Sequence, residues 1–229
     1  MIDIEALVDY AAEDDPDFRN RLKGAAPGDI ARLEAFAGFP LPGSYRFFLE
    51  RMGADAGGLK LQAGCRTEPS AVLALHERLR ENPFPLIPKG TILIGAGNLG
   101  ELILDPRKTR EPEVCLYSEG ELARRVSESL EKLLFRRVFQ AHIGRRSNRA
   151  DLEGQNVGPR LLEAAARLRA AGFETLWFSE RDVILARSRE ALVRLQANPP
   201  AMFAEIGAQT PKALAELVES LGRFGLAPG

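Results

Sequence analysis

One segment of the chain matches a pattern with a known chemical use. Residues Gly95 to Gly100 read G-A-G-N-L-G, the glycine spacing that binds the pyrophosphate of dinucleotides, and Glu119 and Glu121 follow near the distance of a ribose-binding acid. That chemistry requires the last glycine to begin a helix whose first amides face the phosphates. Pro106 comes too soon for such a helix. The segment therefore predicts a hairpin turn, and a dinucleotide-binding oxidoreductase is the disfavoured alternative.

Residues that usually perform nucleophilic or metal-assisted chemistry are few and scattered. The chain has two histidines, His76 and His142, and two cysteines, Cys65 and Cys115. No C-x-x-C, H-E-x-x-H or G-x-S-x-G motif occurs, and these four side chains lack the spacing of a zinc site. We therefore expect no catalytic residue, no metal and no cofactor, and two buried reduced thiols rather than a disulfide.

Two charged segments are candidates for contacts with a partner. An acidic run precedes Phe18 and could face a basic surface, with a solvated loop as the alternative. It lacks the glycine turn and the terminal glutamate of a calcium loop. A charged turn between Asp105 and Glu113 is the second segment. The candidate partner-binding residues are Asp14, Asp15, Asp17, Arg107, Lys108 and Glu111.

A basic run covers the stretch from Phe135 to Ala150, which contains no acidic residue. It could meet phosphates or an acidic partner, but it lacks the interleaved aromatic residues of a single-strand binder. A solvated linker is the alternative. The residues of this run are Arg136, Arg137, His142, Arg145, Arg146 and Arg149.

Composition limits the class of protein. The 229 residues are 45% hydrophobic and 28% charged with a formal net charge of −1, which is ordinary for a globular protein and gives no field that attracts nucleic acid or an anionic membrane. No apolar run approaches the length of a membrane span, and the start of the chain lacks the pattern of a signal peptide. We expect a cytoplasmic protein that binds neither membranes nor nucleic acid.

The strongest structural signal is a helical corner over residues 29–59. Asp29 can cap a first helix, which Gly38 ends because glycine adopts a left-handed backbone without strain. Pro40 and Pro42 then prevent continuation of that helix, and Pro42 can begin the next one. The second helix has apolar residues at the i, i+3, i+4 and i+7 positions that predict a buried face; these are Tyr45, Phe48, Leu49 and Met52.

This corner resembles the start of the SUKH superfamily of Smi/Knr-type domains, in which a Leu-Glu pair, a Leu-Pro corner, a tyrosine and a Phe-Leu pair occur in this order. Downstream, a strand at 92–94, the glycine turn, a strand ending in Asp, a strand at 114–117 and a closing helix from Leu122 to Phe139 follow the family's order. The strand after the glycine turn lacks the family's usual aromatic residues. The matching motif residues are Leu33, Glu34, Leu41, Pro42, Tyr45, Phe48, Leu49, Gly57, Gly58, Gly100 and Asp105.

The resemblance implies an α+β domain over residues 1–142, with helices packed on a curved antiparallel sheet. It also implies a non-catalytic immunity protein that blocks a cognate toxin of a bacterial polymorphic-toxin system. A regulatory or scaffolding module unrelated to toxins is the alternative, because a fold alone does not fix a function.

The rest of the chain resembles no family that we identify. A polar linker over 143–157 is expected to lead to a small α/β domain over 158–229. Its predicted elements are a helix at 159–171, strands at 173–179 and 183–187, a helix that Ser188 caps and that ends at Asn198, and a helix that begins at Thr210-Pro211. An exposed Trp177 would indicate a binding patch.

Overall fold

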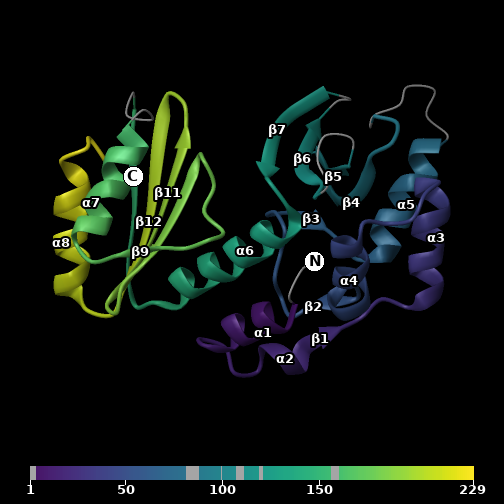
Figure 1. Cartoon of the computed structure of the whole chain (residues 1–229), viewed down its shortest axis with the longest axis horizontal. Coiled ribbons are helices and arrows are strands. Elements are labelled where there is room, and N and C mark those ends of the chain that lie inside the picture. The colour runs from purple at the N-terminus through teal and green to yellow at the C-terminus, as the bar shows by residue number, and fades with distance from the viewer. Residues whose placement is uncertain (1–3, 81–87, 99, 107–110, 119–120, 156–159) are drawn as a thin grey trace. The chain divides into compact units, whose positions relative to one another are not determined.

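The computed structural model describes residues 4–80, 88–98, 100–106, 111–118, 121–155 and 160–229 (Figure 1). The protein is an α+β protein, as the sequence predicts, and its sheets are antiparallel. The chain divides into two compact units, Met1–Arg137 and Val138–Gly229. The division falls inside helix α6 (Leu130–Arg145).

The first unit combines helices with a five-stranded sheet of order β3-β4-β5-β6-β7. Its other helices are α1 (Ile4–Ala12), α2 (Phe18–Arg21), α3 (Pro27–Ala37), α4 (Gly43–Met52) and α5 (Pro69–Arg80). The sheet strands are β3 (Cys65–Arg66), β4 (Ile92–Gly97), β5 (Gly100–Asp105), β6 (Glu113–Ser118) and β7 (Glu121–Ser127). Two short strands, β1 (Leu22–Lys23) and β2 (Asp55–Ala56), pair separately.

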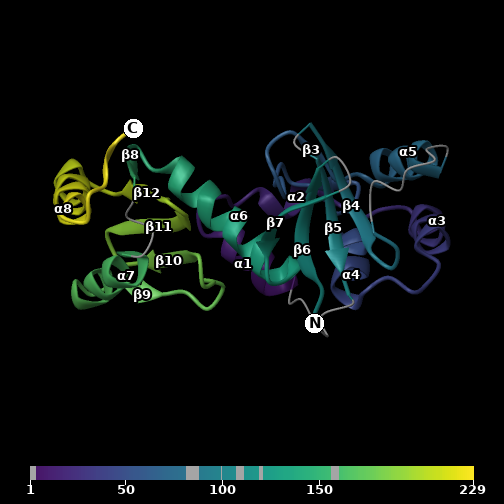
Figure 2. The same ribbon diagram turned by 90° about the horizontal axis from the view of Figure 1, so that it is seen from above.

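The centre of this sheet is buried on both faces. Leu93, Ile94, Leu102, Ile103 and Leu104 are all fully buried, although successive residues of a strand point to opposite faces. Helix α5 packs beside β4, and α3 contacts both α4 and α5 (Figure 2). The central strands therefore carry apolar residues at successive positions, because neither face of the sheet meets water there.

The closing helix of this unit begins later than the sequence suggested. The expected helix from Leu122 to Phe139 is replaced by strand β7 and by α6, which extends to Arg145. The Ser129 hydroxyl accepts a 3.1 Å hydrogen bond from the Lys132 amide, the geometry of an N-cap. The helix formers of 121–127 pair instead with β6, because strand pairing overrides weak local propensity.

The second unit is a six-stranded sheet of order β13-β8-β12-β11-β10-β9 with two helices on one face (Figure 2). Its strands are β8 (Asn148–Gly154), β9 (Glu174–Thr175), β10 (Val183–Arg187), β11 (Ala191–Asn198), β12 (Ala201–Ala208) and β13 (Ala227–Pro228), and its helices are α7 (Leu161–Ala170) and α8 (Pro211–Gly222). The core lies between helices and sheet, where Leu168, Val193, Leu195, Ile206 and Leu221 are at most 2% exposed.

Two expectations for this unit are corrected. The helix predicted from Ser188 to Asn198 is strand β11, and the Ser188 hydroxyl accepts hydrogen bonds from the Glu190 and Ala191 amides at 3.3 and 3.1 Å, so that it closes a hairpin instead of capping a helix. The expected linker over 143–157 contains β8, which pairs with β12 and buries Leu152. Polar residues on its other positions concealed the strand.

The predicted last helix is confirmed. Helix α8 begins at Pro211, and the Thr210 side chain accepts a 3.1 Å hydrogen bond from the Ala213 amide. The predicted strand at 173–179 is shorter than expected, because only Glu174–Thr175 pairs with β10 and Trp177 lies in a turn. Across the described ranges, the protein has no helix with the length and apolar character needed to span a membrane.

Candidate functional site

The corner between α3 and α4 gathers most of the motif residues. Leu33, Leu41, Phe48 and Leu49 are 5% exposed or less, and Tyr45 is fully buried. Pro42 occupies the N-cap position of α4, where a proline costs no helical hydrogen bond. These residues form the core that fixes the angle between the two helices.

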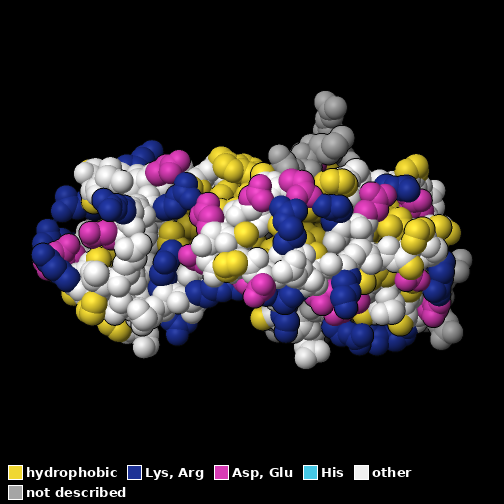
Figure 3. Space-filling model, turned by 90° about the horizontal axis from the view of Figure 1, so that it is seen from below, with side chains coloured by type: hydrophobic (Ala, Val, Ile, Leu, Met, Phe, Trp, Pro, Cys, Tyr) yellow, Lys and Arg dark blue, Asp and Glu magenta, His cyan; other side chains and the backbone are white. Residues whose placement is uncertain are grey.

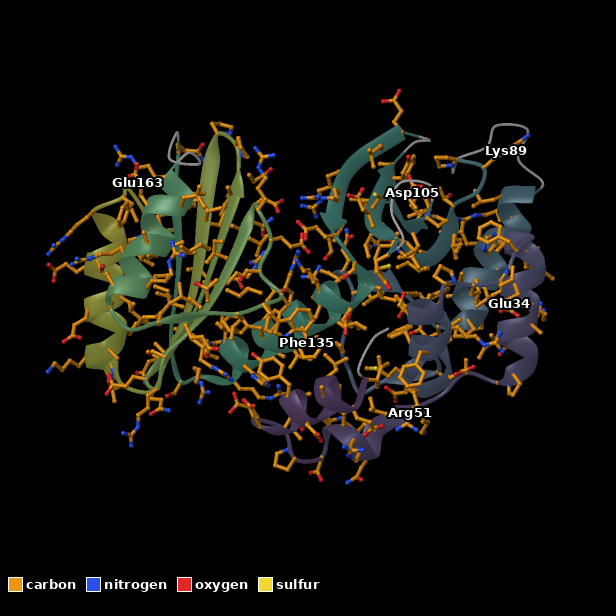
Figure 4. The ribbon with its side chains drawn as sticks, viewed as in Figure 1. Glu34, Arg51, Lys89, Asp105, Phe135 and Glu163 are labelled. Carbon is orange, nitrogen blue, oxygen red and sulfur yellow. The ribbon has the colours of Figure 1, made fainter. Side chains whose placement is uncertain are left out.

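The motif glutamate stabilises the same corner from the surface. The Arg46 guanidinium donates to Glu34 Oε1 at 2.7 Å and to Glu50 Oε1 at 3.0 Å, which links α3 to α4. Figure 4 labels Glu34 on α3. The hydrogen bond that Arg46 donates to Glu50, followed by the charge of Glu34, raises the pKa of Arg46. A pit of about 240 Å³ lies beside these side chains, with Ile30 and Pro27 in its lining.

The motif glycines have positions that a side chain would disturb. Gly57 has φ +66°, and a Cβ there would lie 2.8 Å from the Phe18 ring. Its amide donates to Asp55 Oδ1 at 2.9 Å. Gly58 also has a positive φ of +87°. These residues shape the exit from α4 and contribute no reactive group.

The glycine-rich segment that matched the dinucleotide pattern is a β-hairpin, as the sequence predicts. Strands β4 and β5 pair antiparallel, with Gly97 opposite Gly100. Gly100 begins a strand with φ +123°, and a Cβ there would lie 2.1 Å from the Tyr117 carbonyl oxygen. Gly100 begins strand β5 and not a helix, so the described residues of this segment lack the helix N-terminus that the dinucleotide pattern requires. Asp105, the other motif residue of β5, is 2% exposed at the far end of that strand (Figure 4).

A buried hydroxyl lies in the corner. Tyr45 Oη has no hydrogen-bond partner among the described residues, and burial, with a smaller contribution from Cys65, raises its pKa. Burial also raises the pKa of the Cys65 thiol to about 11. Both cysteines are buried, as the sequence predicts, and neither forms a disulfide within the described residues.

Replacing Tyr45 with phenylalanine is therefore expected to leave the free energy of unfolding unchanged at pH 7 or to raise it by up to about 1 kcal/mol, because a buried hydroxyl without a partner is destabilising. Above about pH 10 the unfolded chain releases a tyrosine proton that the native protein retains, so the wild type should lose more stability than the variant. Urea denaturation at both pH values measures this. A loss above about 1 kcal/mol at pH 7 would mean that the hydroxyl has a partner.

One carboxylate of the acidic run is held in an ion pair. Arg21 donates to both carboxylate oxygens of Asp15, one of them at 3.1 Å, and the Asp15 side chain is only 12% exposed. Asp14 is half-buried and Asp17 is exposed at the start of α2. Two of the three candidate carboxylates therefore reach solvent.

A network of ion pairs adjoins this run. Arg19 donates to Glu5 at 2.8 Å and to Asp9 at 3.0 Å, and Arg51 also pairs with Glu5. The hydrogen bond from Arg19 holds the pKa of Glu5 below its usual value. Figure 3 shows that acidic and basic side chains are interspersed over the visible face.

The charged turn is only partly described. Glu111 is exposed, whereas Arg107 and Lys108 lie outside the described residues. Glu113, at the start of β6, is 3.6 Å from Arg125 of β7. These charges belong to the end of the sheet where β5 stops.

The basic run is not a solvated linker. Arg136 is 6% exposed and donates to the Val126 carbonyl at 3.0 Å, and Arg137 donates to the Leu61 carbonyl at 2.7 Å. Farther along, Arg149 donates to the Gly144 carbonyl at 3.0 Å. These three arginine side chains donate hydrogen bonds to backbone carbonyl oxygens. The pattern of charges in the sequence does not predict such contacts.

The second unit has two further candidate surfaces, of which the sequence indicated Trp177 but not the other. A groove of about 440 Å³ has Phe173 and Leu217 in its floor and Arg167, Arg189 and Glu216 among its lining. Its residues come from three elements that are distant in the chain, so no local signal could find it.

The other surface surrounds Trp177, whose exposed fraction is 57%. Its ring lies edge-on to Phe178 with centroids 5.5 Å apart. The Leu185 amide donates to the Ser179 hydroxyl at 3.0 Å and fastens this turn to β10. The aromatic pair was visible in the sequence, but its exposure depends on the turn.

Within the described ranges, no three His, Cys, Asp or Glu side chains are grouped so that they could hold a metal ion. The geometry therefore offers interaction surfaces: two charged segments on the first unit, and a groove and an exposed tryptophan on the second.

Comparison with known proteins gives one match. Residues 24–136 match the model of the SMI1 / KNR4 family (SUKH-1), a segment that contains the α3–α4 corner and the β-hairpin. No curated protein and no solved structure matches the chain. Residues 24–136 therefore form a domain of the SMI1 / KNR4 family (SUKH-1).

Proposed function

We propose that this protein is a non-catalytic, cytoplasmic immunity protein that binds and neutralises a cognate toxin of a bacterial polymorphic-toxin system. The observation that carries the proposal is the family match over residues 24–136. A rigid corner and sheet that present charged loops suit the recognition of a protein surface, because little ordering is then required on binding.

The charged segments of the first unit are our candidates for the rim of the interface. They contain Asp14 and Asp17 in the acidic run and Glu111 in the charged turn, together with Arg107 and Lys108, which lie outside the described residues. Charges at a rim mostly set the association rate and its salt dependence, whereas buried anchors hold a complex together.

Replacing Asp14 and Asp17 together with asparagine is expected to slow association with a basic partner by severalfold at low salt and less at physiological salt. Asp15 is left intact because it pairs with Arg21. Stopped-flow mixing with the protein that co-purifies with the tagged chain measures the rates at two salt concentrations.

The matched control is Glu163→Gln with Glu219→Gln, which removes the same charge from α7 and α8 of the second unit and leaves the groove unchanged. The control should associate at the wild-type rate. Equal rates for wild type and the Asp14/Asp17 variant at low salt would exclude this segment from the interface.

The function itself is tested by expressing the product of a neighbouring gene in cells with and without this chain. Growth arrest that the chain relieves supports immunity. The second candidate, a regulatory or scaffolding module, is favoured by the second unit, which lies outside the family match and exposes Trp177. Stable co-purification of a partner that arrests no growth would support that alternative.

A further inference from the structure

The two large sheets end in four edge strands of unequal length. Three of them, β3, β9 and β13, have two residues each. Strand β7 has seven residues and is the longest of these four edge strands in the part of the chain that the structure describes. A long edge presents backbone N–H and C=O groups that another strand can pair with.

Strand β7 exposes an apolar side chain and two cations. Leu122 is 47% exposed, and Arg124 and Arg125 are exposed. Arg125 lies 3.6 Å from Glu113, while the Arg124 side chain makes no hydrogen bond or ion pair with the described residues. The edge therefore carries basic charge that a partner could neutralise.

The usable length of this edge is limited. The register of β7 on β6 shifts on both sides of Arg124 and Arg125, and such bulges interrupt a continuous ladder. The Val126 carbonyl already accepts from Arg136 at 3.0 Å. The stretch that remains before Val126 is Glu121–Arg125. It contains the register shift between Leu122 and Arg124, so an added strand must follow that bulge.

We propose that β7 binds an extended, acidic segment of a protein partner by strand addition. Backbone groups of the segment pair along Glu121–Arg125, and carboxylates at two successive positions meet Arg124 and Arg125, which project to opposite faces of the strand. An apolar residue of the segment covers Leu122. The inference shares with the proposed function only the premise of a protein partner, and it holds whether or not that partner is a toxin.

The test uses a synthetic peptide, Thr-Val-Glu-Glu-Val-Thr, and the isotope-labelled full chain. Titration followed by NMR should shift the amide resonances of Glu121–Arg125 and slow their hydrogen exchange. The peptide with lysines in place of the glutamates, and a peptide whose backbone amides are methylated on its pairing edge, should bind at least about tenfold more weakly.

The variant Arg124→Glu with Arg125→Glu should also reduce affinity by about tenfold or more. Its matched control, Arg66→Glu on the two-residue edge strand β3, should bind as the wild type does. The proposal is overturned by equal binding of the lysine peptide, by shifts confined to residues outside β7, or by no binding at millimolar peptide. The peptide titration tests strand addition alone, so a negative titration does not change the outcome of the growth assay. A negative growth assay likewise does not change the outcome of the titration.

Discussion

Truncation of Phe48 to alanine is expected to lower the free energy of unfolding by roughly 3–5 kcal/mol. The Phe48 ring is 1% exposed on α4 and stacks on Tyr45, with ring centroids 6.3 Å apart. Removing it loses the transfer free energy of the ring and leaves a cavity in the corner that joins α3 to α4. Urea denaturation followed by circular dichroism measures the change.

The control for this prediction is Leu122→Ala in the same unit, because the Leu122 side chain is already 47% exposed. Its cost should be well below that of Phe48→Ala. A change of about 0.5 kcal/mol or less at Phe48 is the size expected of a surface position, and it would mean that this face of α4 is not buried.

Replacement of Gly100 with alanine is the second large effect, a loss of roughly 2–5 kcal/mol. The backbone of Gly100 has φ +123°, which residues with a Cβ rarely adopt, and the new methyl group would lie 2.1 Å from the Tyr117 carbonyl oxygen on β6. Either the strands separate locally or the hairpin changes its turn. Thermal and urea unfolding of the purified variant report the loss.

Gly38→Ala separates the two causes. Gly38 also has a positive φ, +78°, but nothing lies within 4 Å of the position of its Cβ, so only the backbone cost of about 1–2 kcal/mol applies. The excess at Gly100 measures the collision with β6 together with the added backbone strain of φ +123°. Equal losses for the two variants would show that β6 moves aside without cost.

The helical corner was predictable because its signals are local. Gly38 and Pro42 end and begin helices by their own backbone preferences, and the spacing of Tyr45, Phe48 and Leu49 selects one helical face. The hairpin at Gly100 was predictable for a similar reason, since Pro106 excludes the competing helix.

Strands β7 and β11 were not predictable in this way. Their sequences, Glu121–Ser127 and Ala191–Asn198, contain good helix formers, and their extended form depends on pairing with other strands. The roles of Asp15 and Arg136 were hidden for a related reason: a charge pattern does not show which carboxylate or carbonyl a long side chain reaches.

The position of the unit division within α6 affects how either half can be expressed as a gene fragment. The family match ends at residue 136 and the first compact unit at Arg137, while the helix continues to Arg145. A stop codon at this division would leave half a helix whose last carbonyls have lost their partners, and short isolated helices are marginal in water. Overlapping fragments, one ending after Arg145 and the other starting before Leu130, keep the helix whole in both products.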